Sequence, residues 1–204
     1  MFDALHGFLE PAFTLLGSPV SWLEIVAFAL SVVMVVLNMR VNPLAWPLAI
    51  LASLLYGWLF LDGKLYGEAG LQVLFVIVAF WGWWQWLRGK GEDGEKLHVQ
   101  RLSRRGAAIA LIITLAGWPL LGTFLAHATD SPLPYWDALP TVGSLVGQWL
   151  LGRKYEDNWP AWIAVNAVSL VLFGLKGYWL TVALYAVFIP MSVAGWRQWR
   201  SMQA

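Results

Sequence analysis

Polar side chains set within long apolar segments are the residues of this sequence that could do chemistry. In hydrocarbon a polar group must find a partner or face a cavity, so each one is informative. Their spacing puts them on single helix faces, which predicts six polar stripes pointing at a shared central cavity. The stripes are Glu24, Ser31 and Asn38; Ser53 and Tyr56; Glu68 and Gln72; Thr141, Ser144 and Gln148; Trp162, Asn166 and Ser169; and Thr181 and Tyr185.

The chemistry that these side chains offer is hydrogen bonding and ring contact. Amides, hydroxyls and indoles near the middle of a membrane suit a polar ligand that carries a ring. An alternative is that single Ser, Thr and Asn side chains only bond helices together. Glu24 could balance a cationic ligand, support a neighbouring helix, carry a proton or reach the membrane surface, and we favour the first two roles. The candidate binding residues are Trp46, Gln72, Gln148, Trp162, Asn166, Tyr185 and Glu24.

Catalytic chemistry has little support in this sequence. The chain has no cysteine, and its three histidines lie far apart, outside the apolar segments. No metal-ligand spacing, nucleophile elbow or phosphate loop occurs, so we expect neither an enzyme nor a cofactor. The basic residues sit in the connections between apolar segments, which gives no sign of nucleic-acid binding. A membrane-embedded enzyme and a passive scaffold or sensor are the competing functions.

The composition identifies the elements that must position these residues. Of 204 residues, 59% are hydrophobic and 12% are charged, whereas soluble domains carry about 25% charged residues. This is a polytopic membrane protein with a mean hydropathy of +0.63. Residues 1–18 have roughly helical apolar spacing and are interpreted as a short helix at the membrane surface. Seven spans are predicted, at 20–39, 43–61, 66–87, 106–126, 137–152, 159–175 and 178–198.

The distribution of charge predicts the orientation of these spans. With the N-terminus outside, eleven basic residues fall on the inner side, and only Lys64 and Lys176 fall outside. The positive-inside rule favours this arrangement, with a cytoplasmic C-terminus. Lys64 and Lys176 are interpreted as anchors at lipid headgroups.

Three sequence landmarks occur twice at nearly constant offsets. Gly-Trp-x-Gln-Trp at 82–86 returns at 195–199, Trp46-Pro47 returns at Trp159-Pro160, and Lys64-x-Tyr66 returns at Lys176-x-Tyr178. The repeats predict one transmembrane domain built as 3+1+3, with triple-helix units at 20–88 and 137–200. The apolar span at 106–126 joins them, so that both units have the same orientation.

Most tryptophans are predicted to lie at the membrane interfaces. Trp22, Trp136 and Trp179 would lie at the outer interface, and Trp86 and Trp199 at the inner one. The repeated Gly-Trp-x-Gln-Trp motif is expected to pack at the inner rim rather than contact the ligand.

Several runs of this sequence resemble the nicotinamide riboside transporter (PnuC) family of bacterial vitamin transporters, over about residues 20–200. They are Trp46-Pro47-Leu48, Leu65 to Gln72, Gly82 to Trp86, Gly147 to Leu150, Asn158-Trp159-x-x-Trp162 and Tyr178-x-x-Thr181-x-x-x-Tyr185.

The resemblance implies an all-α membrane protein related to the SWEET sugar transporters, in the bacterial inner membrane. It implies uptake of nicotinamide riboside by facilitated diffusion, with a cytoplasmic kinase that traps the substrate, and a possible homo-oligomer. Thiamine, riboflavin and deoxynucleosides are alternative substrates, and proton coupling is an alternative mode. Glu24 and Glu68 are the carboxylates that could couple protons, and their sparseness favours passive transport.

Overall fold

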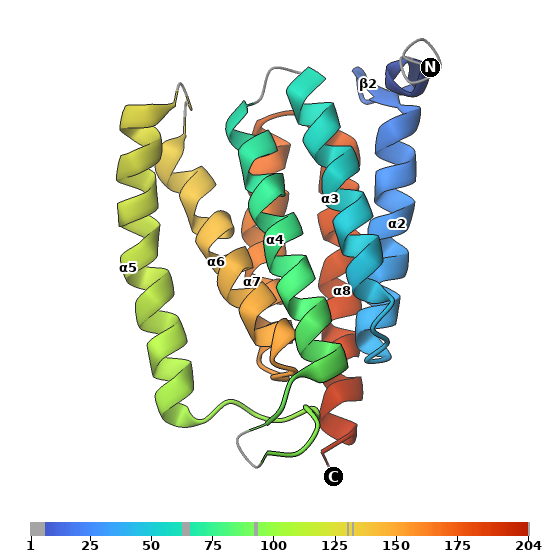
Figure 1. Ribbon diagram of the computed structural model, residues 1–204. Helices are drawn as coiled ribbons and strands as arrows, with labels where there is room; N and C mark the ends of the chain where they lie inside the picture. The colour runs from blue at the N-terminus through green and yellow to red at the C-terminus, as the bar shows by residue number, and fades with distance from the viewer. Residues whose placement is uncertain (1–6, 63–65, 92–93, 130, 132, 204) are drawn as a thin grey trace.

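The computed structural model describes residues 7–62, 66–91, 94–129, 131 and 133–203. Over these residues the chain forms a short N-terminal β-hairpin and then seven long helices that run roughly side by side (Figure 1). The strands are β1, Pro11–Leu15, and β2, Ser18–Ser21. The helices are α2, Trp22–Met39; α3, Ala45–Asp62; α4, Tyr66–Arg88; α5, Arg104–Ala128; α6, Pro134–Gly152; α7, Asn158–Leu175; and α8, Trp179–Ser201.

The hairpin corrects the expectation of a surface helix over residues 1–18. Strands β1 and β2 pair antiparallel across a turn at Leu16 and Gly17, both of which have positive φ. A two-residue turn with positive φ at both positions matches the twist of a hairpin. Residues 7–9 are helical, and the first six residues lie outside the described part of the chain.

Local signals begin and end the helices. Ser21 and Glu24 form a capping box at the start of α2, which satisfies backbone N–H groups that the first turn leaves open. Pro134 stands at the first position of α6, where its missing N–H costs nothing. Both α2 and α6 end in a short turn whose second residue, Val41 or Lys154, has positive φ.

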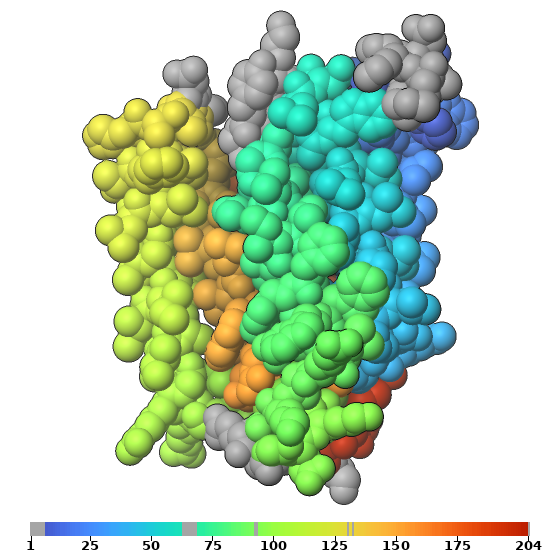
Figure 2. Space-filling view, in the orientation of Figure 1, coloured from blue at the N-terminus to red at the C-terminus, as the bar shows by residue number. Residues whose placement is uncertain are grey.

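Six of the helices close into a ring. Helix α2 packs on α3, α3 on α4, α4 on α6, α6 on α7, α7 on α8, and α8 returns to α2. Helix α5 packs on α6 at the edge of the bundle, and Figure 2 shows α6 set back between α5 and α4 on one face. The loop between α4 and α5 and the C-terminus lie at one end, here the lower end, and the hairpin lies at the upper end (Figure 1).

The helices differ in how well their composition suits lipid. Six of them, α2, α3, α4, α5, α7 and α8, are long and apolar enough to cross a membrane. Helix α6 is not one of these, because its 19 residues include Asp137, Gln148 and two prolines. Many of its residues are buried between α4, α5 and α7. Helix α5 therefore covers a polar helix that would otherwise face lipid.

Candidate functional site

Two cavities lie inside the helix ring. The lower cavity encloses about 990 Å³ of space free of atoms, its mouth included, and the upper cavity about 700 Å³. Four residues line both cavities and so stand between them: Tyr56, Phe75, Ser144 and Tyr185. The two cavities thus follow one another through the bundle.

The polar stripes predicted from the sequence converge on these cavities. Ser31, Asn38, Ser53, Gln148, Trp162 and Asn166 line the lower one, Gln72, Thr141, Ser169 and Thr181 line the upper one, and Tyr56, Ser144 and Tyr185 line both. These side chains therefore line the interior of the ring, but they line two cavities rather than the one shared cavity that was predicted. The side chain of Glu68 lies outside the described part of the structure.

Six of the seven candidate binding residues line a cavity. Trp46, Gln148, Trp162 and Asn166 line the lower one, Gln72 the upper one, and Tyr185 both. Glu24 is the exception. Its carboxylate accepts from the backbone N–H of Ser21 at 3.2 Å and caps α2 at the upper end of the bundle. The structure thus gives Glu24 a role in the helix cap.

Asn166 is the most deeply placed amide of the predicted set. It is 2% exposed, and its Nδ2 donates to Ser192 Oγ at 3.4 Å, which links α7 to the neighbouring helix α8. Gln148 on α6 is also buried. Buried polar groups are normally fully hydrogen-bonded, yet Asn166 Oδ1 has no partner within the described protein. The amide oxygen of Asn166 is therefore buried without a partner, although the residue lines the cavity.

Four tryptophans close the lower end of the ring. The ring of Trp46 meets Trp86 edge to face at 5.5 Å between centroids, and Trp159 meets Trp199 in the same way at 5.6 Å. Trp86 and Trp199 are 6.2 Å apart between centroids. We call Trp46, Trp86, Trp159 and Trp199 the tryptophan cluster. All four are buried, so the interpretation of Trp86 and Trp199 as interface residues is wrong.

The tryptophan cluster joins the two halves of the chain. Trp86 Nε1, at the end of α4, donates to Leu151 O at the end of α6 at 3.0 Å. Trp199 Nε1, at the end of α8, donates to Asn38 O and Met39 O at the end of α2, at 3.1 and 3.0 Å. Carbonyl groups at a helix end lack partners within their own helix. Helix α4 therefore caps the end of α6, and helix α8 caps the end of α2.

Loops seal this end from below. Gln100, after α4, exchanges backbone hydrogen bonds with Lys154 and Glu156, between α6 and α7. Lys154 Nζ donates to Leu97 O at 2.9 Å and lies 5.2 Å from the centroid of the Trp86 ring. Burial lowers the pKa of Lys154, because the charged form loses its hydration.

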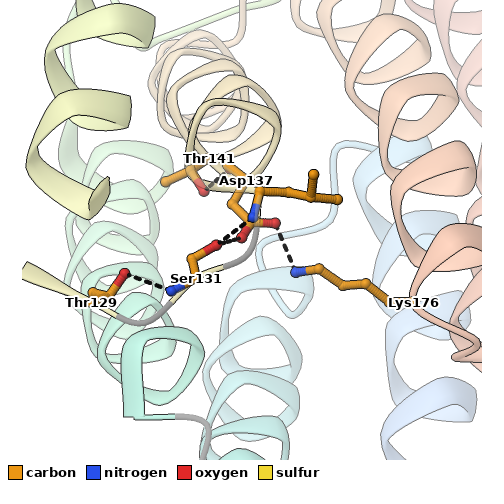
Figure 3. A network of polar contacts seen from close by, with 6 residues as sticks. Thr129, Ser131, Asp137, Thr141 and Lys176 are labelled. Atoms are coloured by element: carbon orange, nitrogen blue, oxygen red, sulfur yellow. Dashed lines mark hydrogen bonds and ion pairs between the residues drawn. The ribbon is translucent and has the colours of Figure 1, made fainter. Parts of the chain in front are cut away.

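A polar network stands at the upper cavity (Figure 3). Lys176 Nζ lies 2.7 Å from Asp137 Oδ1, and Ser131 Oγ donates to Asp137 Oδ2 at 2.6 Å. Asp137 lines the upper cavity, at the start of α6, and Lys176 belongs to the turn between α7 and α8. The interpretation of Lys176 as a headgroup anchor is therefore wrong, because its ammonium is held by a carboxylate. Lys64 lies outside the described residues.

Sequence reasoning missed several residues of the lower cavity. Asn158, Trp159 and Ser192 line it and are at most 2% exposed, and Phe75 and Phe188 line it as well. A usable signal was present. Many cavity positions recur 113 residues apart, namely Trp46 with Trp159, Ser31 with Ser144, Ser53 with Asn166, Gln72 with Tyr185, and Phe75 with Phe188. Extending the repeat to every position would have found Trp159, Phe75 and Phe188.

The family model described as nicotinamide mononucleotide transporter matches residues 21–201, nearly the whole chain. The chain belongs to the nicotinamide mononucleotide transporter family. This confirms the resemblance noted in the sequence. The matched region contains every helix of the ring and both cavities.

The relatives of this chain are named after different substrates. The chain is 31% identical to the riboflavin/roseoflavin transporter RibM of Streptomyces davaonensis, over 92% of this chain and 89% of that protein. It is 23% identical to the nicotinamide riboside transporter PnuC of Escherichia coli (90% and 87%) and 26% identical to that of Neisseria mucosa (91% and 74%).

The fold of the chain also matches a solved transporter. A crystal structure of the vitamin B3 transporter PnuC superposes with a TM-score of 0.75 and 26% identity, covering 89% of this chain and 81% of that one. The family and the fold are thus those of transporters rather than enzymes. Within the described residues, His, Asp and Glu form no group of three that could hold a metal ion.

Proposed function

We propose that this protein takes up nicotinamide riboside across the cytoplasmic membrane by facilitated diffusion. The observation that carries the proposal is the lower cavity, which lies inside the helix ring and is lined by indoles, other aromatic rings and amides. The name of the Escherichia coli relative supports the choice of substrate.

The lining of the lower cavity suits a flat ring. Trp162, Tyr185 and Phe188 come from α7 and α8, and Phe75 from α4. None of the described residues that line this cavity is Asp, Glu, Lys, Arg or His. Nicotinamide riboside is a flat cation, and aromatic faces attract cations without any carboxylate. In this cavity Gln148 and Asn166 then hydrogen-bond its polar groups and Trp46 and Trp162 contribute their indoles, whereas Gln72 lines the upper cavity.

Riboflavin is the second candidate substrate. Two observations favour it: the 31% identity to a riboflavin/roseoflavin transporter over most of both chains, and the lack of charge in the lining of the lower cavity. Riboflavin is neutral and larger, and both molecules combine a flat ring with a hydroxylated chain. Thiamine and deoxynucleosides are further candidate substrates with less support.

The proposed mode of transport is passive. Asp137 is the one carboxylate among the described lining residues of the two cavities, and it is paired with Lys176. Proton-coupled carriers commonly use buried carboxylates along the pathway. A cytoplasmic kinase would then trap the substrate, because the phosphate it adds finds no cationic side chain in the lining of the lower cavity.

The proposed topology has seven membrane spans in a 3+1+3 arrangement, with the lower end in the cytoplasm. Helices α2 to α4 and α6 to α8 form the two units, and α5 connects them. Support comes from the basic residues gathered in the lower loops, which the positive-inside rule places in the cytoplasm. Helix α6 serves as the fifth span because α5 shields it from lipid.

Uptake into liposomes and equilibrium binding test this function. Purified protein should bind nicotinamide riboside, and liposomes that contain it should fill to the external concentration and stop, whatever pH gradient is imposed. An enclosed kinase should make uptake continue. Asn166→Ala should weaken binding roughly tenfold, because the lost hydrogen bond leaves a ligand group unpaired. Tighter binding of riboflavin would transfer the proposal to riboflavin, and uphill uptake driven by protons would refute the passive mode.

A further inference from the structure

Two interfaces join the two halves of the helix ring, and they differ at the lower end. Helix α4 packs on α6 at one interface, and α8 packs on α2 at the other. The 113-residue repeat places equivalent residues at both: Gln85 and Arg153 at the first correspond to Gln198 and Arg40 at the second. Two identical units would join both interfaces in the same way, but this chain joins them differently.

The α4–α6 interface is held at its lower end by two side chains. Trp86 Nε1 donates to Leu151 O at 3.0 Å. Arg153 Nη1, at the end of α6, donates to Gln85 Oε1 and to Lys90 O, both at 3.2 Å. Three hydrogen bonds thus join the lower end of α4 to that of α6.

The loop between α4 and α5 adds a second set of hydrogen bonds at the same interface. The backbone of Gln100 bonds to Lys154 O at 3.1 Å and to the N–H of Glu156 at 2.9 Å. The N–H of Leu102 donates to Asp157 Oδ2 at 2.7 Å. This loop continues directly from α4, and its partners lie in the turn between α6 and α7. Separation of α4 from α6 would therefore break these bonds as well.

The α2–α8 interface is held more weakly at its lower end. Among the described residues, one side chain supplies the hydrogen bonds there: Trp199 Nε1 donates to Asn38 O and Met39 O, at 3.1 and 3.0 Å. Arg40 is exposed, and in the same part of the chain no hydrogen bond joins it to Gln198. The bridge that Arg153 forms at the other interface thus has no equivalent here.

The lower cavity lies against this weaker interface. Asn38 on α2 and Ser192 on α8 line it, whereas Phe75, near the partition, is the one described lining residue from α4. Movement of the lower end of α8 away from α2 would open the cavity toward the lower end of the bundle. The upper ends would stay joined, because Ser18 Oγ of the hairpin donates to Gly177 O, before α8, at 3.0 Å.

We propose that the lower cavity opens by separation of α8 from α2, while the α4–α6 interface stays closed. Opening between α2 and α8 loses the hydrogen bonds of one indole, whereas opening between α4 and α6 loses those of two side chains and a loop. The open form that breaks fewer hydrogen bonds is the more populated one. The proposal rests on the proposed transport function and adds the route by which the substrate leaves the lower cavity.

The first test measures how often the lower cavity opens, and it needs no substrate. The chain has no cysteine, so Ser192→Cys places a single thiol on the cavity wall. Its rate of reaction with a water-soluble maleimide, in purified full-length protein in nanodiscs, follows the open population. Adding Trp199→Phe, which removes the indole N–H and keeps an aromatic ring, should speed labelling roughly three- to tenfold. Trp86→Phe, the equivalent change at the α4–α6 interface, should alter it less than twofold, because Arg153 and the loop still hold that interface.

The second test locks each interface in turn. Arg40→Cys with Gln198→Cys, and the equivalent pair Arg153→Cys with Gln85→Cys, are each joined by a short bis-methanethiosulfonate cross-linker. Uptake of nicotinamide riboside and of riboflavin into liposomes is then measured. Locking the α2–α8 interface should lower uptake at least roughly tenfold, and a reducing agent should restore it. Locking the α4–α6 interface should leave uptake within about twofold of the unlinked protein. None of these four residues lines either cavity.

Both tests have outcomes that overturn the proposal. Labelling that is faster in Trp86→Phe than in Trp199→Phe would do so, as would unchanged labelling in both variants or loss of uptake when the α4–α6 interface is locked. Thermal melting identifies a misfolded tryptophan variant, and the cross-linked pairs leave the tryptophan cluster unaltered. If labelling differs as expected but neither vitamin is taken up, the proposed function fails and the opening interface stands. If uptake proceeds and labelling does not differ, only the opening interface fails.

Discussion

Replacing Gly82 or Gly195 by alanine should destabilise the protein through the tryptophan cluster. Gly82 lies on α4 against the ring of Trp46, and Gly195 lies on α8 against the ring of Trp159. A Cβ at Gly195 would stand 2.6 Å from the nearest ring atoms of Trp159, and a Cβ at Gly82 would be closer still to Trp46. Neither ring has room to yield, because both are buried against a second tryptophan.

The size of the effect is the difference between two terms. Overpacking a well-filled core typically costs about 1–3 kcal/mol. Alanine gains about 0.5–1 kcal/mol over glycine inside a helix. The net loss of stability is up to about 2.5 kcal/mol, which for a chain of this size lowers Tm by up to roughly 10 °C. Because the two sites meet through Trp86 and Trp199, the double variant should depart from additivity.

Thermal melting of purified protein measures this loss, with Gly70→Ala as the control. Gly70 also lies on α4, and a Cβ there would meet nothing within 4 Å. The Gly70→Ala variant should gain only the helix propensity of alanine, about 0.5–1 kcal/mol of stability, and melt slightly higher than the wild type. If Gly82→Ala and Gly195→Ala melt like Gly70→Ala, the packing of the tryptophan cluster described above is refuted.

Three further predictions follow from charged groups. Asp137→Asn and Lys176→Met should each destabilise by about 1–3 kcal/mol by removing one partner of a partly buried ion pair, while the double variant should recover much of the loss in a thermal double-mutant cycle. Burial lowers the pKa of Lys154, so unfolding takes up a proton just below pH ~10.4. The stability of the wild-type protein should therefore rise with pH in that window, and the stability of Lys154→Met should not. Melting curves at several pH values measure the difference. Reporter fusions at the C-terminus and near Gly94 should both report cytoplasm, and a periplasmic signal from either would end the seven-span topology.

The cavities could be foreseen because helical spacing converts a sequence period into a face. Ser31 and Asn38 are seven residues apart, so they share one side of α2, and both line the lower cavity. The residue type alone could not show that Trp86 and Trp199 are buried against helices far away in the sequence. Trp86 and Trp199 have the residue type of a membrane interface, but their N–H groups reach carbonyls about 65 and 160 residues away in the chain.

Local sequence patterns that fit more than one structure explain the other differences between prediction and structure. Phe13 and Leu16 fit a helical period, but Gly17 and Pro19 between them and α2 favour a hairpin, and the hairpin is what forms. Asn158 escaped notice because it follows a charged turn and looked like a loop residue, whereas it begins α7 and is fully buried. Lys176 resembled an interface lysine because its partner, Asp137, is 39 residues away in sequence.

The bond from Trp199 to the end of α2 has a consequence for biosynthesis. A ribosome releases Asn38 and Met39 long before it releases Trp199, which stands five residues from the C-terminal Ala204. Until then the carbonyls at the end of α2 lack the indole that caps them, and the ring of helices cannot close. Completion of the lower end of α2 therefore waits for the synthesis of about 160 further residues. A chain that stops after α7 would lack both the indole of Trp199 and the packing of α8 on α2 that closes the ring.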